Sequence, residues 1–104
     1  MSKSIMQRDD GICYLCKKLY DGEWHQETEE HHCFGASNRS LSEHFGLKVY
    51  LCIPHHRTSK EAVHQNIEMM RLVQRDAQTA FETKYPDLDF RVIFGRNYKE
   101  VSEA

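Results

Sequence analysis

Alternating apolar and polar positions predict two short strands and one long helix. Residues 47–52 are rich in β-forming side chains and are followed by Pro54, which predicts a strand. Residues 29–34 alternate less evenly and predict a second strand. Over residues 59–84, apolar side chains recur every three or four positions, which is the spacing of one helix face. These side chains are Val63, Ile67, Met70, Val73, Ala77 and Phe81.

A capping pattern predicts a short helix between the two strands. Ser40 is followed three positions later by Glu43, which is the spacing of a capping box. Gly46 suits the left-handed backbone position after a helix. We therefore expect residues 41–45 to form one or two helical turns.

A second capping pattern sets the predicted boundaries of the long helix. Thr58 with Glu61 has capping-box spacing at its start. Pro86 ends it, because proline lacks an amide hydrogen and restricts the residue before it. Residues 87–95 fit either a short strand or a helical turn, and both interpretations stay open.

The length of 104 residues allows one small domain, for which these elements predict an α+β fold. Residues 11–98 carry the patterned sequence. Polar residues 1–10 are expected to form a flexible arm, and residues 99–104 a frayed tail. Met69 and Leu72 could form a dimer seam, although a buried core face is the commoner meaning of such positions.

Composition and charge exclude several functional classes. With 39% hydrophobic and 29% charged residues, the chain has the composition of neither a disordered nor a membrane protein. Residues 1–10 carry charges where a signal peptide has its apolar stretch, so we expect a cytoplasmic location. The formal net charge of -2 lacks the basic bias of a protein that coats nucleic acid. Any contact with nucleic acid must therefore be local.

Two short-spaced pairs of metal-binding residues predict a structural zinc site. Cys13 and Cys16 form one pair, Cys52 and His55 form the other, and 35 residues separate the two pairs. Three thiolates and one imidazole suit tetrahedral Zn²⁺, and a small domain gains stability from such a site. The alternative is that they are ordinary buried thiols and a surface histidine, but buried cysteines have no reason to pair at this spacing.

Cys33 leaves the ligand count open. It could replace His55 in a site of four thiolates, or pack in the predicted strand as a small apolar residue. We favour packing, because Cys33 lacks a partner at metal-ligand spacing.

An excess of histidines points to a second site. If His55 binds zinc, His31, His32, His56 and His64 still need an explanation. Adjacent residues on an ideal strand point to opposite faces, so His31 and His32 could enter one site only with a bulge or a twist. The alternative is that these histidines are exposed or are hydrogen-bonded core residues.

These motifs together resemble the HNH endonuclease group, whose ββα-metal finger holds one divalent ion between two strands and a helix. More narrowly, they are similar to small HNH-like proteins of phages and prophages, over about residues 12–98. The Cys-x-x-Cys pair, Glu30-His31-His32 and the segment Leu51 to His56 carry the general likeness. The narrower likeness rests on His31-His32-x-Phe34-Gly35, Asn38-Arg39, Gly46-Leu47-x-Val49-Tyr50-Leu51-Cys52, Ala62-Val63-His64 and Phe94-Gly95-Arg96-Asn97-Tyr98.

The resemblance implies roles for individual residues. It makes His32 the general base and His31 a ligand of a catalytic ion, which could be Mg²⁺, Mn²⁺, Ni²⁺ or Zn²⁺. The last ligand could be either His56 or His64. The family's middle asparagine, which orients the base, has no equivalent in residues 47–51; Asn38 is the nearest candidate and Asn66 a weaker one.

The expected activity is hydrolysis of DNA phosphodiester bonds, with no membrane partner. Basic residues near the histidines could hold phosphates: Arg39, Lys48, Arg57 and Lys60. An acidic cluster of Glu27, Glu29 and Glu30 should repel the backbone unless a metal neutralises it. This cluster and the missing asparagine support the alternative, a catalytically inactive zinc-binding module that binds nucleic acid or a host protein. A redox switch at Cys13 and Cys16 is disfavoured, because the usual βαβ context is absent.

Overall fold

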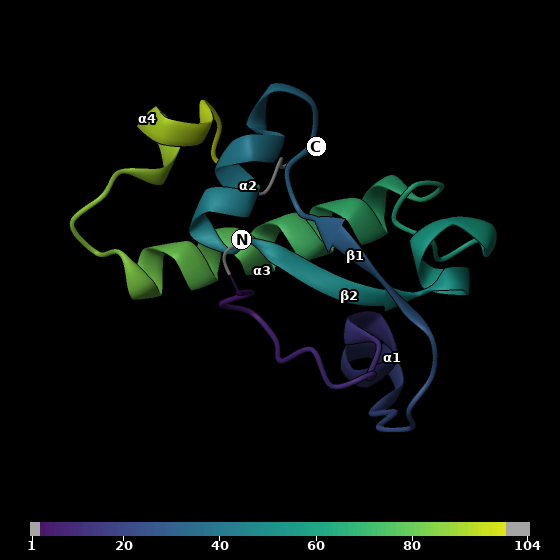
Figure 1. Ribbon diagram of the computed structural model, residues 1–104. Coiled ribbons are helices and arrows are strands. Elements are labelled where there is room, and N and C mark those ends of the chain that lie inside the picture. The colour runs from purple at the N-terminus through teal and green to yellow at the C-terminus, as the bar shows by residue number, and fades with distance from the viewer. Residues whose placement is uncertain (1–2, 100–104) are drawn as a thin grey trace.

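Two antiparallel strands form the centre of an α+β domain, with the helices arranged around them (Figure 1). The structure, a computed structural model, describes residues 3–99. In chain order the elements are α1 (Tyr14–Tyr20), β1 (Thr28–His32), the 3₁₀ turn η1 (Ala36–Asn38), α2 (Arg39–Phe45), β2 (Lys48–Cys52), the π-helical turn η2 (Pro54–Thr58), α3 (Ile67–Lys84) and α4 (Phe90–Phe94). The predicted α+β class and both predicted strands are confirmed.

The sheet has an unbroken antiparallel register. Thr28 lies opposite Cys52 and His32 opposite Lys48, with no bulge between them. Successive side chains on β1 therefore point to opposite faces. His31 shares its face with Val49, whereas His32 shares the other face with Lys48.

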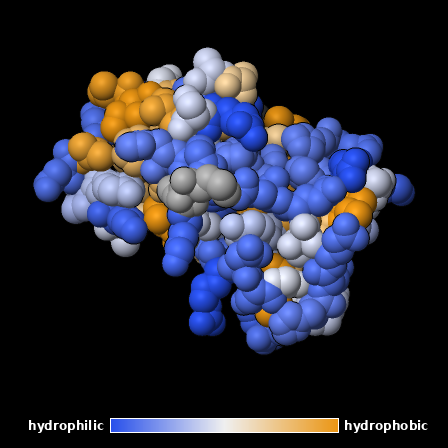
Figure 2. All heavy atoms as spheres, viewed as in Figure 1, coloured by the Kyte–Doolittle hydropathy of each residue, from blue (hydrophilic) through white to orange (hydrophobic). Residues whose placement is uncertain are grey.

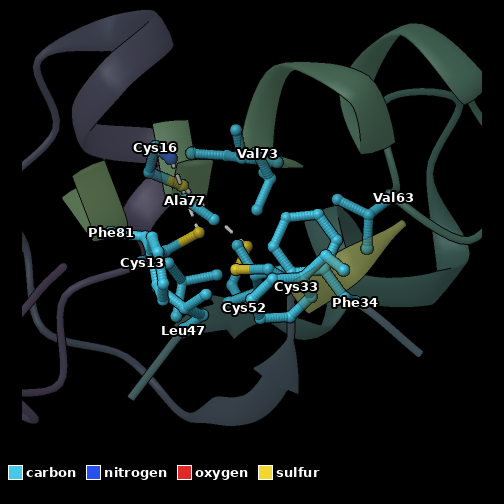
Figure 3. Packing of buried hydrophobic residues seen from close by; sticks show 14 of the residues in the cluster. Cys13, Cys16, Cys33, Phe34, Leu47, Cys52, Val63, Val73, Ala77 and Phe81 are labelled. Atoms are coloured by element: carbon cyan, nitrogen blue, oxygen red, sulfur yellow. Dashed lines mark hydrogen bonds between the residues drawn. The ribbon is translucent and has the colours of Figure 1, made fainter. Parts of the chain in front are cut away.

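The helix α3 crosses behind the two strands and closes the core (Figure 1). Val73, Ala77 and Phe81 are buried as predicted, and Figure 3 shows them near Phe34 and Leu47. Met69 and Leu72, the candidates for a dimer seam, are half-buried and pack against this core. No helix within residues 3–99 combines the length and apolar composition needed to cross a membrane.

The start of the long helix was predicted eight residues too early. α3 begins at Ile67, and the Asn66 side chain accepts hydrogen bonds from the backbone amides of Glu68 and Met69 at 2.9 and 3.2 Å. The predicted cap, Thr58, instead ends the π-helical turn η2. Ile67 is consequently 63% exposed rather than part of the buried helix face.

The short helix α2 begins earlier than predicted and is not capped by Ser40. Asn38 is its N-terminal flanking residue, and it makes no side-chain capping bond. Because α2 starts at Arg39, Glu43 lies beyond its first turn, and the Glu43 carboxylate binds His32 and Lys48. The predicted end is correct, since Gly46 has the left-handed φ of 72°.

Residues 87–95, for which a strand and a helical turn were both considered, contain a short helix. In α4 the Asp89 side chain accepts hydrogen bonds from the amides of Arg91 and Val92 at 3.0 and 3.3 Å. Phe90 and Phe94 are buried against the core. Val92 is 78% exposed, and Figure 2 shows a hydrophobic patch over this part of the surface.

Part of the predicted flexible arm is bound to the sheet. Ile5 donates its amide to the Gly46 carbonyl at 2.9 Å, and Tyr50 donates its amide to the Gln7 side chain at 2.7 Å. These contacts satisfy backbone groups just before β2 and on its outer edge, which would otherwise be left open. Residues 1–2 of the predicted arm and 100–104 of the predicted tail lie outside the described residues.

Candidate metal centres

Four buried side chains from distant parts of the chain converge into one cluster, here called the cysteine centre: Cys13, Cys16, Cys52 and His55. Cys13 precedes α1 and Cys16 lies in its first turn, so the helix aims both thiols inward. Cys52 ends β2, and η2 turns the chain back so that His55 faces the thiols. Figure 3 shows the cysteine sulfurs close together within the core.

Distances in the cysteine centre match a tetrahedral zinc site. His55 Nδ1 lies 3.6, 3.4 and 3.4 Å from the sulfurs of Cys13, Cys16 and Cys52. The Cys16 and Cys52 sulfurs are 3.9 Å apart. Standard zinc bond lengths give tetrahedral edges of roughly 3.6 Å between sulfur and nitrogen and roughly 3.8 Å between sulfurs. The cluster is therefore compatible with a structural zinc ion.

A second layer of contacts orients the ligands of the cysteine centre. His55 Nε2 lies 3.3 Å from a Glu61 carboxylate oxygen, which leaves Nδ1 bare for a metal. Tyr20 donates its hydroxyl to the same carboxylate at 2.5 and 2.7 Å. Hydrogen bonds from Tyr20 and then His55 lower the pKa of Glu61. Burial raises the pKa of the Cys16 thiol overall, and the Gln26 amide, which donates to the Cys16 sulfur at 3.5 Å, partly offsets this.

Cys33 lies outside this cluster. Its side chain is fully buried, and its sulfur lies 3.6 Å from the sulfur of Met6. Burial raises the pKa of the Cys33 thiol, so it stays protonated. The structure places Cys33 as a packed core residue, the arrangement favoured over a ligand in place of His55.

Three imidazoles converge on the opposite side of η2, in a group here called the histidine centre: His31, His56 and His64. One nitrogen from each lies within 4.8 Å of the others. The Nε2 atoms of His56 and His64 are 3.2 Å apart. The His31 ring centroid lies 5.3 Å from that of His56 and 5.2 Å from that of His64. His56 and His64 were alternatives for the last ligand. Because both face His31, both can belong to the same site.

His31 supplies a buried nitrogen that lacks a partner. The residue is 5% exposed, and its Nε2 makes no hydrogen bond within residues 3–99. A buried polar atom left unpaired is costly, and a bound cation is one way to satisfy it. Burial, together with His56 and His64, lowers the pKa of His31 to about 3. The ring is therefore neutral, which is the form that binds metals.

Glu29 orients His56 toward the other imidazoles. The His56 Nδ1–H donates to a Glu29 carboxylate oxygen at 2.7 Å, which leaves Nε2 as the bare nitrogen. Arg57 holds the same carboxylate through two hydrogen bonds of 3.1 and 2.7 Å. The hydrogen bond from His56, followed by those from Arg57, lowers the pKa of Glu29. This arrangement also occupies Arg57, a predicted phosphate ligand.

His32 reaches the same hollow as the histidine centre although its ring lies on the other face of β1. A hollow of about 310 Å³ is lined by His31, His32, His56 and His64, and also by Arg39. β1 is an edge strand in a sheet of two, so side chains from both faces can border one opening. The pairing of β1 with β2 contains no bulge, which was one of the two ways considered for both histidines to enter one site.

A carboxylate and a buried lysine support His32. The His32 Nε2 lies 2.8 Å from a Glu43 carboxylate oxygen. Lys48 is 1% exposed, and its ammonium lies 3.0 Å from Glu43 and 3.2 Å from Glu30. Burial lowers the pKa of Lys48, but its hydrogen bonds to the two carboxylates outweigh this and raise it overall. Although Glu30, His32 and Glu43 have metal-ligand spacing, the Lys48 ammonium already binds both carboxylates.

The four predicted phosphate ligands therefore differ in their availability. Lys48 was predicted wrongly, because it is buried between two carboxylates. Arg57 is 57% exposed but is paired with Glu29. Arg39 is exposed and borders the hollow, whereas Lys60 is exposed on the chain between η2 and α3.

The two candidate asparagines do not contact the predicted base. Asn38 donates its side-chain amide to the Phe94 carbonyl at 3.1 Å, and Asn66 caps α3. Glu43 orients His32 instead. Sequence reasoning missed Glu43, and also missed Glu61, because both act across segments that the fold brings together.

Comparisons with protein-family models, with curated proteins and with solved structures find no match to this chain, so the HNH resemblance stays a prediction carried by its own residues.

Proposed function

We propose that the protein is a metal-dependent endonuclease of the HNH type that hydrolyses DNA phosphodiester bonds. The observation that carries this proposal is the buried His31, whose Nε2 has no partner in the described residues and whose ring faces two further imidazoles in a hollow that His32 also borders. Neutral imidazoles grouped around one point are suited to binding a divalent cation. A histidine beside such a cation is suited to activating water.

In this proposal β1, β2 and the turn after β2 form the ββα-metal core, and a zinc ion in the cysteine centre holds that turn. His55 and His56 are neighbours on η2, so one turn serves both centres. The motif resemblance additionally suggests a phage or prophage origin and a cytoplasmic place of action in the bacterial host.

The histidine centre would hold a catalytic divalent cation through His31, His56 and His64. When bound, the cation supplies charge stabilisation to a phosphate oxygen and to the leaving 3′-oxygen. Among Mg²⁺, Mn²⁺, Ni²⁺ and Zn²⁺, an all-imidazole set favours the transition metals over Mg²⁺. Glu29 fixes the His56 ring so that Nε2 faces the centre.

His32 would act as the general base through Nδ1. Its Nε2–H donates to Glu43, and the lone pair of the neutral ring then lies on Nδ1. That nitrogen can accept the proton of a water molecule as the water attacks phosphorus. Lys48 holds the Glu43 side chain in place, so that the carboxylate can stabilise the imidazolium that forms.

Nicking of supercoiled plasmid DNA tests the proposal. Wild-type protein should nick the plasmid with Mg²⁺, Mn²⁺ or Ni²⁺, and His32→Ala should lower the rate by about 10²–10⁴. His25→Ala is a matched control, because His25 is an exposed histidine outside both centres. Equal activity in wild type and His32→Ala would reject the assignment.

A second candidate is a zinc-stabilised module that binds nucleic acid or a host protein without cleaving. The engagement of Asn38 by Phe94 favours this function, because the side chain proposed to orient the base is held elsewhere. Metal analysis separates the two functions. Two metal ions per chain support the nuclease, whereas one ion, with none at the histidine centre, supports the module.

A further inference from the structure

Acidic side chains around the hollow are paired with cations from the protein itself. The Glu29 carboxylate binds His56 and Arg57, and Glu30 binds Lys48. Glu43 binds both Lys48 and His32. The acidic side of the hollow is thus largely neutralised by its own contacts. Lys48 and Arg57 are thus already engaged by carboxylates, whereas Arg39 is the exposed arginine that borders the hollow.

Two arginines without an ion pair in the described residues lie on α3 and on the chain after α4. Arg71 Nη1 donates to the Gln74 side chain at 2.5 Å, and its guanidinium lies 5.5 Å from the Tyr98 ring centroid. The Arg96 guanidinium lies 5.0 Å from the same centroid. Neither arginine makes an ion pair with a carboxylate anywhere in residues 3–99.

This pair of arginines is continuous with the hollow. Gln74, the partner of Arg71, borders the hollow and donates its amide to the Cys33 carbonyl at 3.2 Å. Tyr98 packs on Phe34 with ring centroids 4.9 Å apart, and Phe34 directly follows Cys33 in the chain. Gln74 therefore places Arg71 beside the hollow, and the shared Tyr98 ring places Arg96 next to Arg71.

We propose that Arg71 and Arg96, placed against Tyr98, bind backbone phosphates of the DNA strand that flanks the cleaved bond. This inference rests on the proposed nuclease function and names the surface through which the substrate is held. Two guanidinium groups share one aromatic ring with no carboxylate to neutralise them, an arrangement that an anion would stabilise. Guanidinium groups bind phosphate through two parallel hydrogen bonds, and the ring limits their motion.

The site would recognise the sugar-phosphate backbone rather than base sequence. Phosphate contacts fix the position and direction of a duplex, and they make binding depend on salt. Each phosphate contact that is lost should reduce the slope of log affinity against log salt concentration by about 1. If the two arginines only stack on Tyr98 and contact no phosphate, replacing them should leave this slope unchanged.

Salt-dependent binding to a short fluorescein-labelled duplex tests the inference. Fluorescence anisotropy would be measured in the His32→Ala background, so that the DNA is not cut. Arg71→Gln and Arg96→Gln should each lower the slope by about 1, and the double variant by about 2. Lys84→Gln is the matched control: Lys84 lies at the far end of α3, where it also contacts an aromatic ring, that of Tyr85. It should leave the slope unchanged.

The outcomes separate this inference from the proposed function. If wild type nicks plasmid and the background protein binds duplex, an unchanged slope in the double variant would overturn the inference alone. If the folded protein neither nicks plasmid nor binds duplex, the proposed function fails and the inference fails with it. Thermal melting of each variant, followed by circular dichroism, identifies any change that comes from unfolding.

Discussion

His55 and His56 are consecutive in the chain, yet their rings face different clusters. His55 Nδ1 lies 3.4 Å from the sulfurs of Cys16 and Cys52, whereas His56 Nε2 lies 3.2 Å from His64 Nε2. The π-helical turn η2 makes this divergence possible, because it carries both residues on one tight turn of backbone. A metal bound in the cysteine centre would therefore also fix the position of the histidine centre.

Removing a cysteine of the cysteine centre should unfold the domain, whereas removing Cys33 should not. In Cys52→Ser, zinc binding fails, and zinc binding in such small domains supplies much of the folding free energy. Cys33→Ala removes a thiol that lies outside the centre and should retain one zinc ion per chain. Elemental analysis and thermal melting measure both effects. Equal zinc content in the two variants would contradict this arrangement.

Replacing Glu61 should weaken zinc binding without removing a ligand. Glu61 orients His55 and is itself held by Tyr20, so Glu61→Gln should lower zinc affinity by about 10–100-fold. Competition with a chromophoric chelator measures the affinity. Glu68→Gln, a change at the exposed start of α3, is the control and should leave zinc affinity unchanged. An unaltered affinity in Glu61→Gln would show that the His55 contact has no such role.

His64→Ala should abolish binding of the second cation and leave the zinc in place. His64 is exposed, so the substitution removes an imidazole with little effect on the core. Loss of even an outer partner lowers metal affinity by about 10–100-fold, so loss of a direct ligand should lower it by at least about 100-fold. Titration calorimetry with Mn²⁺ or Ni²⁺ measures this, with His44→Ala as the exposed-histidine control. A second cation bound equally well by His64→Ala would count against the histidine centre.

Glu43→Gln should reduce cleavage while retaining both metal sites. The amide keeps the shape of the side chain but removes the charge that would stabilise protonated His32. We expect the cleavage rate to fall by about tenfold or more, within the overall contribution of general-base catalysis. Ser40→Ala, on the same helix, is the control because Ser40 does not cap α2. Plasmid nicking measures the rate. A loss of bound metal in Glu43→Gln would indicate a structural role instead.

Ligand pairs at short spacing could be predicted because their geometry is local. Cys13 and Cys16 share the start of one helix, and Cys52 and His55 share one chain reversal, so spacing alone carries the signal. The convergence of His31 with η2 was expected only from the family resemblance, since it depends on how β1 pairs with β2. That pairing is set by contacts between segments far apart in the chain.

The beginning of α3 could not be read from capping patterns, because two caps compete. Thr58 and Asn66 both fit the start of a helix, and tertiary contacts decide between them. Val63 and His64 donate their backbone amides to the carbonyls of His55 and His56, which holds this segment against η2 instead of in a helix. The same contacts bring His64 to the histidine centre.

Lys48 was predicted to hold a phosphate, but its ammonium is buried between two carboxylates. Register places Lys48 opposite His32, where Glu30 and Glu43 enclose its ammonium. Lys48→Met should therefore destabilise the fold by about 1–3 kcal/mol, because two partly exposed carboxylates lose the ammonium that lies between them. The exposed Lys60→Met should change stability by less than about 0.5 kcal/mol.

Urea unfolding of the zinc-loaded protein, followed by circular dichroism, measures the difference between the two lysine variants. DNA binding by Lys48→Met at a temperature where it stays folded should keep the salt dependence of wild type, since the buried ammonium of Lys48 contacts no phosphate. A normal stability with a reduced salt slope would instead place Lys48 on the DNA, and would contradict its enclosure by Glu30 and Glu43.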